Sequence, residues 1–505
     1  MPNLTLGVDL GTTSTKAVLV DSSGVVIAEA SRPVPLHSDH PGWSEADPAD
    51  WWENLCRIVP KILDDARAMA GDIAAVATSG MVPAVMLLNT DGQPLGRAVL
   101  QNDVRATDEI SVLANRLVGT DLVTRTGSPL SQQSVAPTLL WFQRHAMDRW
   151  RRARWIVGSY DWLAIALGAE PHVERNWALE SGLHELSELT PMEHMAGAWI
   201  DEVLRAATVP ADLLAPVHRS GQVVGEVSRA AAYATGLAPG TAIVVGGADH
   251  VMSAYAAGLA VPGDWLVKLG GAGDVLVVTS RVFVDSRLYL DAHPESGLWL
   301  PNGCMATSGT LLRWLQGLLG EKDLAILDQE AATSLPAQIV CLPYLLGEKS
   351  PIHDPMLRGA FVGLHLGHSR GDLYRAALES IAFGFRSHME VFAERGIELG
   401  RARVTNGGSR SRVWKQILAD VMGVPLDPVI AHPGASLGAA VAAGVGVGTT
   451  PSWKAGVATI SYDVPVEPDL RLRDRYEEAY QCFRETGRSL APVSHRLAVA
   501  ARAGP

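Results

Sequence analysis

Cysteine is scarce in this sequence, and its few positions follow no recognised spacing. Four cysteines occur in 505 residues, and no two of them form a CxxC pair. A disulfide framework needs many cysteines, and a cysteine-based zinc site needs closely spaced ones. We therefore expect reduced, mostly structural thiols at Cys56, Cys304, Cys341 and Cys482.

Positive charge and long apolar runs are also lacking. The 42 Lys and Arg residues face 54 Asp and Glu residues, a formal net charge of −12, which argues against nucleic acid or an anionic membrane surface as a partner. The longest run of apolar and small residues, 435–448, falls short of the ~20 residues that a membrane span requires. The N-terminus alternates like a strand, so we expect no export signal there. We expect a cytoplasmic protein.

Several common nucleotide-binding and catalytic motifs are absent. No GxxxxGK[ST] loop occurs, and the glycines of 444–448 do not continue as a strand-opening GxGxxG fingerprint. His184-Glu185 is not followed by the second histidine of a zinc-protease helix. If this chain binds phosphate, a hairpin turn is the remaining candidate.

Length and a repeated opening pattern indicate two domains. A single core stops growing near ~250–300 residues, and this chain has 505. Residues 4–28 read as strand, Gly/Thr turn, strand, turn and strand, and residues 265–278 repeat the strand, glycine turn and strand. We predict an α/β protein of two duplicated halves around a central cleft, with an N-terminal domain of residues 1–242 and a C-terminal domain of residues 243–505.

The first candidate for chemistry is the turn from Asp9 to Lys16, with the sequence DLGTTSTK between two apolar strands. Glycine lets backbone approach a ligand, hydroxyl and amide groups donate to phosphate oxygens, and lysine adds positive charge. The Asp9 carboxylate suits a hydrated Mg²⁺. The alternative is a polar hairpin turn with a solvated lysine.

The second candidate is Asp249, which follows the short apolar strand 243–245 and two glycines. A carboxylate at the carboxyl end of a strand can project into a cleft and accept a proton from a substrate hydroxyl. The alternative is that Asp249 only caps the following helix, because Asp is a favoured N-cap residue. The neighbouring His250 is, taken alone, typical of a hydrogen-bonded core or rim residue.

A third group consists of glycine turns in the second half, at 270–273, 308–310 and 406–409. Several such turns in one domain suit a nucleotide lying against backbone, although each one singly is typical of an ordinary turn. Four tryptophans, Trp43, Trp51, Trp52 and Trp141, are candidates for a sugar pocket, with burial in a core as the default.

The chain to about residue 490 resembles the FGGY carbohydrate kinases in the order and spacing of its segments. The most specific match is Gly359–Leu364 followed after seven residues by Asp372–Glu379, which is similar to the second signature of the family throughout. The opening DLGTTSTK, Pro41–Glu45 with Asp50–Trp52, and Asn406–Trp414 are also similar. The resemblance implies two duplicated actin-like (ribonuclease-H-like) domains, phosphate transfer from ATP to a sugar with Mg²⁺, and a homodimer.

Carried over residue by residue, the resemblance implies a complete site. Asp249 would be the general base and Asp9 would position Mg²⁺. The phosphates and adenosine of ATP would meet Gly11, Thr12, Thr13, Lys16, Gly270, Gly271, Gly309, Thr310, Gly407, Gly408 and Arg412. The sugar would meet Met81, Val82, Pro83, Gln101, Asn102, Asp103 and His250.

Within the family the chain looks most like the xylulokinases, with departures on the sugar side. Pro83, Gln101 and His250 stand where those kinases commonly have His, Trp and Asn. Proline offers no side-chain donor or acceptor to a sugar hydroxyl. In the second half, Gly270-Gly271-Ala272-Gly273 replaces Gly-Thr-Ser-Gly, which removes two hydroxyls.

The sequence therefore predicts an ATP- and Mg²⁺-dependent kinase of a small ketose or polyol, with D-xylulose as the first substrate. One alternative is a kinase of another sugar, such as ribulose, erythritol, glycerol or gluconate. The other is a non-catalytic nucleotide-dependent sugar sensor on the same fold, because fold does not fix function.

Overall fold

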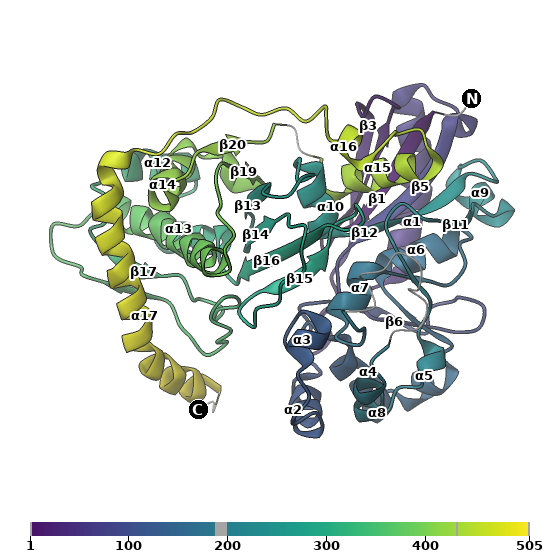
Figure 1. Cartoon of the computed structure of the whole chain (residues 1–505), viewed down its shortest axis with the longest axis horizontal. Helices are drawn as coiled ribbons and strands as arrows, with labels where there is room; N and C mark the ends of the chain where they lie inside the picture. Colours follow the sequence, from purple (N-terminus) through teal and green to yellow (C-terminus); the bar gives the residue numbers. More distant parts are fainter. Residues whose placement is uncertain (1–2, 187–198, 431–432, 503–505) are drawn as a thin grey trace.

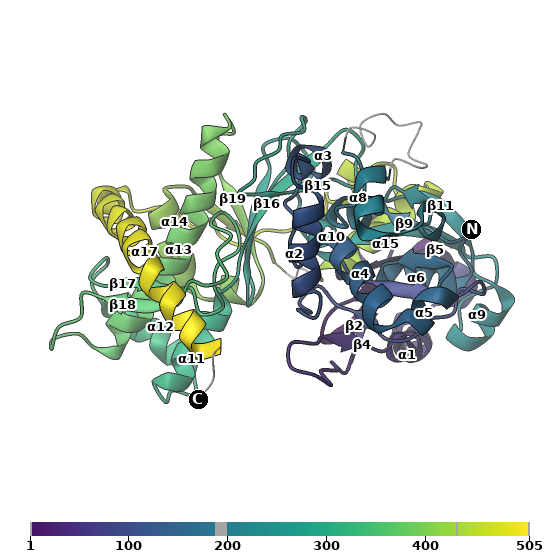
Figure 2. The same ribbon diagram turned by 90° about the horizontal axis from the view of Figure 1, so that it is seen from below.

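The computed structural model describes residues 3–186, 199–430 and 433–502 and shows two α/β bodies side by side (Figure 1, Figure 2). The first body contains most of the N-terminal half, and the second contains most of the C-terminal half. Each body is built around one six-stranded sheet.

The first sheet has the strand order β11–β12–β5–β1–β2–β3. Strands β1, β2 and β3 form an antiparallel meander, whereas β5 and β12 run parallel to β1. Helices cover both faces of the sheet, and most residues of its central strands are buried. The strands are β1 (Leu4–Leu10), β2 (Ser14–Val20), β3 (Val26–Pro33), β5 (Ile73–Gly80), β11 (Val223–Glu226) and β12 (Ala242–Ala248).

The second sheet repeats this plan with the order β15–β16–β14–β13–β19–β20. Strands β13, β14 and β16 form the antiparallel meander, and β19 and β20 continue parallel to β13. The predicted duplication of α/β halves is thereby confirmed. The strands are β13 (Trp265–Leu269), β14 (Gly273–Val277), β15 (Tyr289–Ala292), β16 (Trp299–Met305), β19 (Ala402–Thr405) and β20 (Leu426–Pro428).

Local signals in the sequence fix the ends of several helices. Helix α1 (Pro48–Ala66) begins with Pro at its first position, and the Asp47 side chain accepts from the backbone of Ala49. Helix α13 (Arg370–Glu394) opens with a capping box of Ser369 and Asp372. Other helices used below are α6 (Ser159–Leu167), α7 (Arg175–Glu180), α10 (Asp249–Ala256), α11 (Gly309–Leu318), α14 (Arg412–Met422), α15 (Ala435–Val447) and α17 (Arg473–Arg502).

Helix α15 comes from the C-terminal half of the chain but packs on the first sheet (Figure 1). Its alanines Ala439 and Ala443 form one apolar cluster with Ala75 and Ala77 of β5 and Val244 of β12. Small residues on both surfaces let helix and sheet backbones approach closely. The chain therefore crosses three times between the two bodies, because α17 lies again on the second body, against α13 and α14.

The expected domain boundary between residues 242 and 243 stays a prediction. The chain leaves the first sheet only after this boundary. Strand β12 begins at that boundary and is hydrogen-bonded to β5 of the first sheet. The second sheet begins only with β13 at Trp265. A short strand followed by a helix is consistent with the end of the first domain as well as with the start of the second.

Gly7 of β1 lies where α15 touches the sheet, and we expect Gly7→Ala to lower the free energy of unfolding by about 3 kcal/mol. A Cβ at this position would lie 1.9 Å from the backbone oxygen of Ser436 and 2.4 Å from the backbone nitrogen of Ala440. The matched control is Gly317→Ala in α11, where a Cβ meets nothing within 4 Å. Calorimetry should show a lower midpoint for the first variant only. Equal midpoints would contradict this account of the contact.

The structure tests some of the other expectations from the sequence and leaves others as predictions. All four cysteines are free thiols, as expected. Within the described ranges, no helix combines the length and apolar character needed to span a bilayer. The cytoplasmic location and the homodimer stay predictions.

Candidate active site

The turn between β1 and β2 places Asp9 and Lys16 side by side. The two residues are partners in the antiparallel pair, so their side chains leave the same face of the sheet. Among the residues that the structure describes, none donates a hydrogen bond to the buried Oδ1 of Asp9. Burial, followed by the negative charge of Asp249, raises the pKa of Asp9 to about 7. A buried carboxylate oxygen without a donor is suited to a hard cation.

Asp249 is the first residue of α10 and follows directly on β12. The N-cap of this helix is Ala248, so the alternative that Asp249 serves as the capping residue is wrong. The side chain is 32% exposed. Partial burial opposes its ionisation, but the neighbouring His250 side chain and the charge of Lys268 lower the pKa of Asp249 below its ordinary value. An ionised carboxylate is the form that can accept a proton.

A cleft of about 880 Å³ between the two bodies brings these groups together. Asp9 and Lys16 reach it from the first sheet, Asp249 from α10, and Lys268 from β13. Its volume lies in the range of small-molecule and cofactor sites. Lysines and carboxylates that line one cleft suit a phosphorylated ligand with a bound cation.

The glycine turns at 270–273 and 308–310 are joined to each other by backbone hydrogen bonds. Gly309 N donates to Gly270 O at 2.9 Å, and Thr310 N donates to Gly271 O at 3.1 Å. A Cβ on Gly270 would lie 3.6 Å from the side chain of Asn406, which lines the cleft. The pair of turns therefore borders the cleft rather than forming its lining.

The third glycine turn contributes to the cleft through part of its length. Asn406, Gly407 and Arg410 line the cleft, together with Lys415 of α14. Gly408 instead packs against Trp414 and Leu269, where a Cβ would clash, and the predicted Arg412 is exposed. The predicted adenosine loop thus lies at the cleft, with Arg410 and Lys415 as its basic groups there.

The predicted phosphate residues Gly11, Thr12 and Thr13 lie in the β1–β2 turn, next to the predicted sugar residues. Thr12 Oγ1 lies 3.2 Å from the sulfur of Met81. Met81 and Val82 are almost completely buried. This segment therefore supplies an apolar wall behind the first turn.

Three further predicted sugar residues, Gln101, Asn102 and Asp103, lie in the turn after β7 (Ala98–Val99). Gln101 is half-buried and Asn102 is exposed. The Asp103 carboxylate accepts hydrogen bonds from Ser44 N at 2.6 Å and from the Arg105 side chain at 2.7 and 2.9 Å. These bonds engage Asp103 within the protein, so its contact with a sugar stays a prediction without geometric support.

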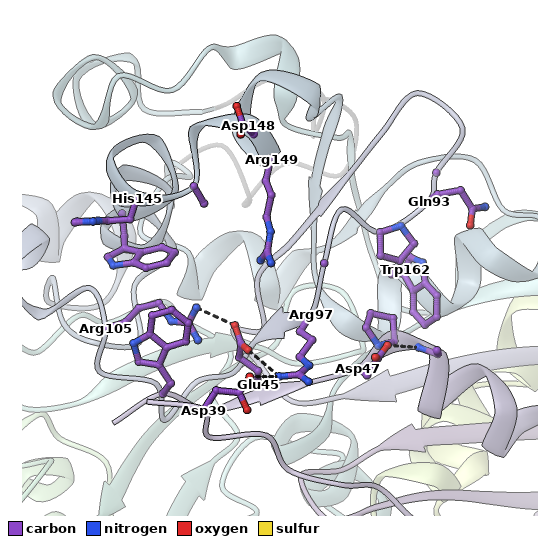
Figure 3. A pocket seen from close by; sticks show the side chains of 18 of the residues that line it. Asp39, Glu45, Asp47, Gln93, Arg97, Arg105, His145, Asp148, Arg149 and Trp162 are labelled. Atoms are coloured by element: carbon purple, nitrogen blue, oxygen red, sulfur yellow. Dashed lines mark hydrogen bonds and ion pairs between the residues drawn. The ribbon is translucent and has the colours of Figure 1, made fainter. Parts of the chain in front are cut away.

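Three of the four candidate tryptophans line a different cavity, of about 1170 Å³, on the first body (Figure 3). Trp43, Trp52 and Trp141 line it, whereas Trp51 is fully buried in the core. Figure 3 shows Glu45 between Arg105 and Arg97. Glu45 Oε1 lies 2.9 Å from Arg105 Nη1, and Glu45 Oε2 lies 3.6 Å from Arg97 Nη1. Neither Asp9 nor Asp249 lines this cavity, so the tryptophans are apart from the proposed reaction centre.

Sequence reasoning missed Lys268, a residue central to the charge of the cleft. It lies 3.5 Å from Asp274 and stabilises the charged forms of Asp249 and Asp9. The signal was present, because Lys268 is the only charged residue in the apolar strand 265–269 that precedes a glycine turn. A charge within a buried strand normally needs a partner.

Comparisons with known proteins agree on one family. Residues 4–256 match the model of the FGGY family of carbohydrate kinases, N-terminal domain, and residues 271–447 match that of the C-terminal domain. A xylulose kinase of Staphylococcus epidermidis is 28% identical over 484 residues, 95% of each chain. An L-xylulose/3-keto-L-gulonate kinase of Escherichia coli is 27% identical over 492 residues, 95% of each chain.

Among solved structures, a xylulose kinase from Rhodospirillum rubrum superposes with a TM-score of 0.90 at 38% identity, over 97% of this chain and 100% of that one. The two family matches agree with the paired six-stranded sheets and with the cleft between them. The chain belongs to the FGGY family of carbohydrate kinases and is a sugar kinase of the two-domain actin-like fold.

Proposed function

We propose that this kinase transfers the γ-phosphate of ATP to a terminal hydroxyl of a small ketose, with D-xylulose as the first substrate to test. The observation that supports the chemistry is Asp249, an ionised carboxylate in a cleft that also presents Lys16 and Lys268. The sugar is inferred from the relatives named xylulose kinases. By the resemblance, Pro83, Gln101 and His250 depart from the usual xylulokinase pattern, so the substrate requires direct measurement.

In the proposed reaction Asp249 accepts the proton of the substrate hydroxyl as its oxygen bonds to phosphorus. Lys16 and Lys268 place positive charge beside the phosphates, while the joined turns at Gly270 and Gly309 border the same cleft. Phosphoryl transfer passes through a loose transition state. Positioning and charge stabilisation should therefore contribute more than proton removal.

Asp9 fits the Mg²⁺ that kinases of this kind use. Its Oδ1 is buried and accepts no hydrogen bond within the described part of the chain, and carboxylate oxygens are preferred ligands of this ion. When bound, Mg²⁺ supplies positive charge to the phosphate oxygens. The neighbouring Lys16 and Lys268 partly compensate the charge of Asp9 in the protein alone.

An ADP-release assay over a panel of sugars tests the proposed function. We expect D-xylulose with Mg²⁺-ATP to give the highest kcat/KM, at least tenfold above L-xylulose, ribulose, erythritol, glycerol and gluconate. Reactions under the same conditions but without sugar measure the background hydrolysis of ATP. A different sugar as the best substrate would refute the xylulose assignment while keeping the kinase chemistry.

The second candidate substrate class is an acidic or L-configured ketose. It is supported by the similarity to the L-xylulose/3-keto-L-gulonate kinase, which covers the chain as fully as the first relative does. A preference for L-xylulose or 3-keto-L-gulonate in the same panel would establish it.

A further inference from the structure

His250 lies next to the proposed base and is surrounded by carboxylates from three elements. Its Nε2 is 2.7 Å from Asp291 Oδ2 of β15 and 3.7 Å from Glu180 Oε1 at the end of α7. Its Nδ1 is 3.6 Å from Asp249 Oδ1. Both ring nitrogens therefore face carboxylates. The sequence predicted that His250 binds the sugar, but in this geometry its polar atoms are directed to acidic side chains.

A packed joint between α7 and β15 brings Asp291 to this position. The Asn176 side chain accepts from Ala292 N at 2.7 Å and donates to Ala292 O at 3.1 Å. Leu179 and Leu290 belong to one buried apolar cluster at the same joint. The joint connects the first body, which carries α7 and α10, to an edge strand of the second sheet.

The second sheet also orients the Asp291 carboxylate. Asn302 of β16 donates to Asp291 Oδ2 at 2.7 Å, the same oxygen that lies against His250. The Asp291 side chain is only 2% exposed. A buried carboxylate with two partners on one oxygen has little freedom to move.

The charges around His250 favour an imidazolium. Burial lowers the pKa of His250, but Asp291, Asp249 and Glu180 together raise it well above its ordinary value. Burial and then the charge of Asp291 raise the pKa of Glu180. Further charged or titratable groups in the described part of the chain lie near these carboxylates: Lys268 and Asp9 near Asp249, Glu174 near Asp291, and Tyr160 and Tyr289 near Glu180.

We propose that His250 is a positioning residue, which Asp291 and Glu180 hold beside Asp249 so that the α7–β15 joint fixes the orientation and charge of the base. This inference rests on the proposed role of Asp249 as the base. It gives His250 a function other than sugar contact, and it assigns roles to Glu180 and Asp291. A carboxylate base that an anchored histidine already orients has less orientational freedom left to lose when the reaction begins than a carboxylate without such support.

The kinetic test compares His250→Asn, Asp291→Asn and Glu180→Gln with the native enzyme on its best sugar. We expect His250→Asn to lower kcat about 100-fold and Asp291→Asn about tenfold, with KM for sugar and ATP unchanged within about threefold, because a positioning residue acts on the base rather than on binding. Asp291→Glu should restore part of the rate. Glu180→Gln should show a loss smaller than that of Asp291→Asn.

The matched control is Asp285→Asn. Asp285 is another buried carboxylate of the second body, but it pairs with Arg287 at 2.8 Å and Arg395 at 2.7 Å rather than with His250. We expect kcat of this variant to stay within about twofold of the native value while its thermal midpoint falls. A similar fall of kcat in this control would overturn the proposal, because any lost buried carboxylate would then have the same effect.

A second measurement separates this proposal from the proposed function, because it needs no substrate. Ring-¹⁵N-labelled histidine spectra, assigned by the missing signal of His250→Asn, should show His250 doubly protonated at pH 7.5 in native protein and more easily deprotonated in Asp291→Asn. If this signature appears while every sugar is silent, the proposed function fails and the His250 contact stands.

Three results would overturn the proposal. A neutral His250 at pH 7.5 would remove the charge that it assigns. A raised sugar KM with unchanged kcat in His250→Asn would return His250 to sugar binding. A stoichiometric transition metal in the purified protein, lost in Asp291→Asn, would mean that the three side chains hold a metal instead.

Discussion

Replacing Asp249 by asparagine is expected to lower kcat about 1000-fold, with KM for ATP changed less than about threefold. Asparagine has the shape of aspartate but cannot accept the proton of a substrate hydroxyl. Asp249 is suited to this role because Lys268 and His250 lower its pKa and keep it ionised in the cleft. Steady-state ADP release on the best sugar measures the loss, and equilibrium binding of a non-hydrolysable ATP analogue checks the nucleotide site.

The matched control for this variant is Asp65→Asn on α1, where the carboxylate forms an exposed ion pair with Lys61. Its removal should leave kcat unchanged, since exposed ion pairs contribute little. A native rate in Asp249→Asn would show that Asp249 is not the base. If native protein and variant bind nucleotide equally and neither phosphorylates any sugar, the non-catalytic sensor becomes the better interpretation.

The sheet framework was predictable because its signals are local. The alternation at 4–10 and the glycine turn that follows are read from neighbouring residues, and β1 and β2 occupy those positions. The repeat at 265–278 gave the second hairpin, β13 and β14, for the same reason. Period-2 patterns and turn residues specify hairpins without knowledge of the rest of the chain.

The assembly of the two bodies was not predictable in the same way. Helix α15 follows β20 of the second sheet along the chain but packs on β1 and β5, because its small residues fit Gly7 and Ala75. A run of alanine and glycine shows that a helix is closely packed, but not which sheet it meets. The boundary near residue 243 was difficult for a related reason, since a buried strand looks the same in either sheet.

The same limit applies to the candidate site. Asp9 and Asp249 stand beside glycine turns or at a strand end, so each could be proposed from its own neighbours. Glu180 and Asp291 lie 70 and 41 residues away from His250 along the chain, and no local pattern joins them. Their meeting depends on the packing of α7 against β15. Their proximity to His250 is therefore a property of the folded structure alone.

Replacing Asp9 by asparagine is expected to lower kcat about 1000-fold and, in the absence of Mg²⁺, to stabilise the protein by about 1 kcal/mol. Burial and the nearby charge of Asp249 both disfavour the Asp9 carboxylate, as its raised pKa indicates. A neutral side chain of the same shape removes this repulsion, but it also removes a ligand proposed to hold Mg²⁺. Function and stability should therefore change in opposite directions.

The contrasting control is Asp21→Asn in the next turn of the same meander. Hydrogen bonds from Ser23 and Val25 act against partial burial and lower the pKa of Asp21, so its charge stabilises the turn. This variant should keep the native kcat and unfold at a lower temperature. Thermal midpoints measured with EDTA, together with rates over a range of Mg²⁺ concentrations, distinguish the two carboxylates. If Asp9→Asn is less stable than the native protein, Asp9 stabilises the fold. That result would contradict the claim that the buried Asp9 charge lowers stability while it serves catalysis.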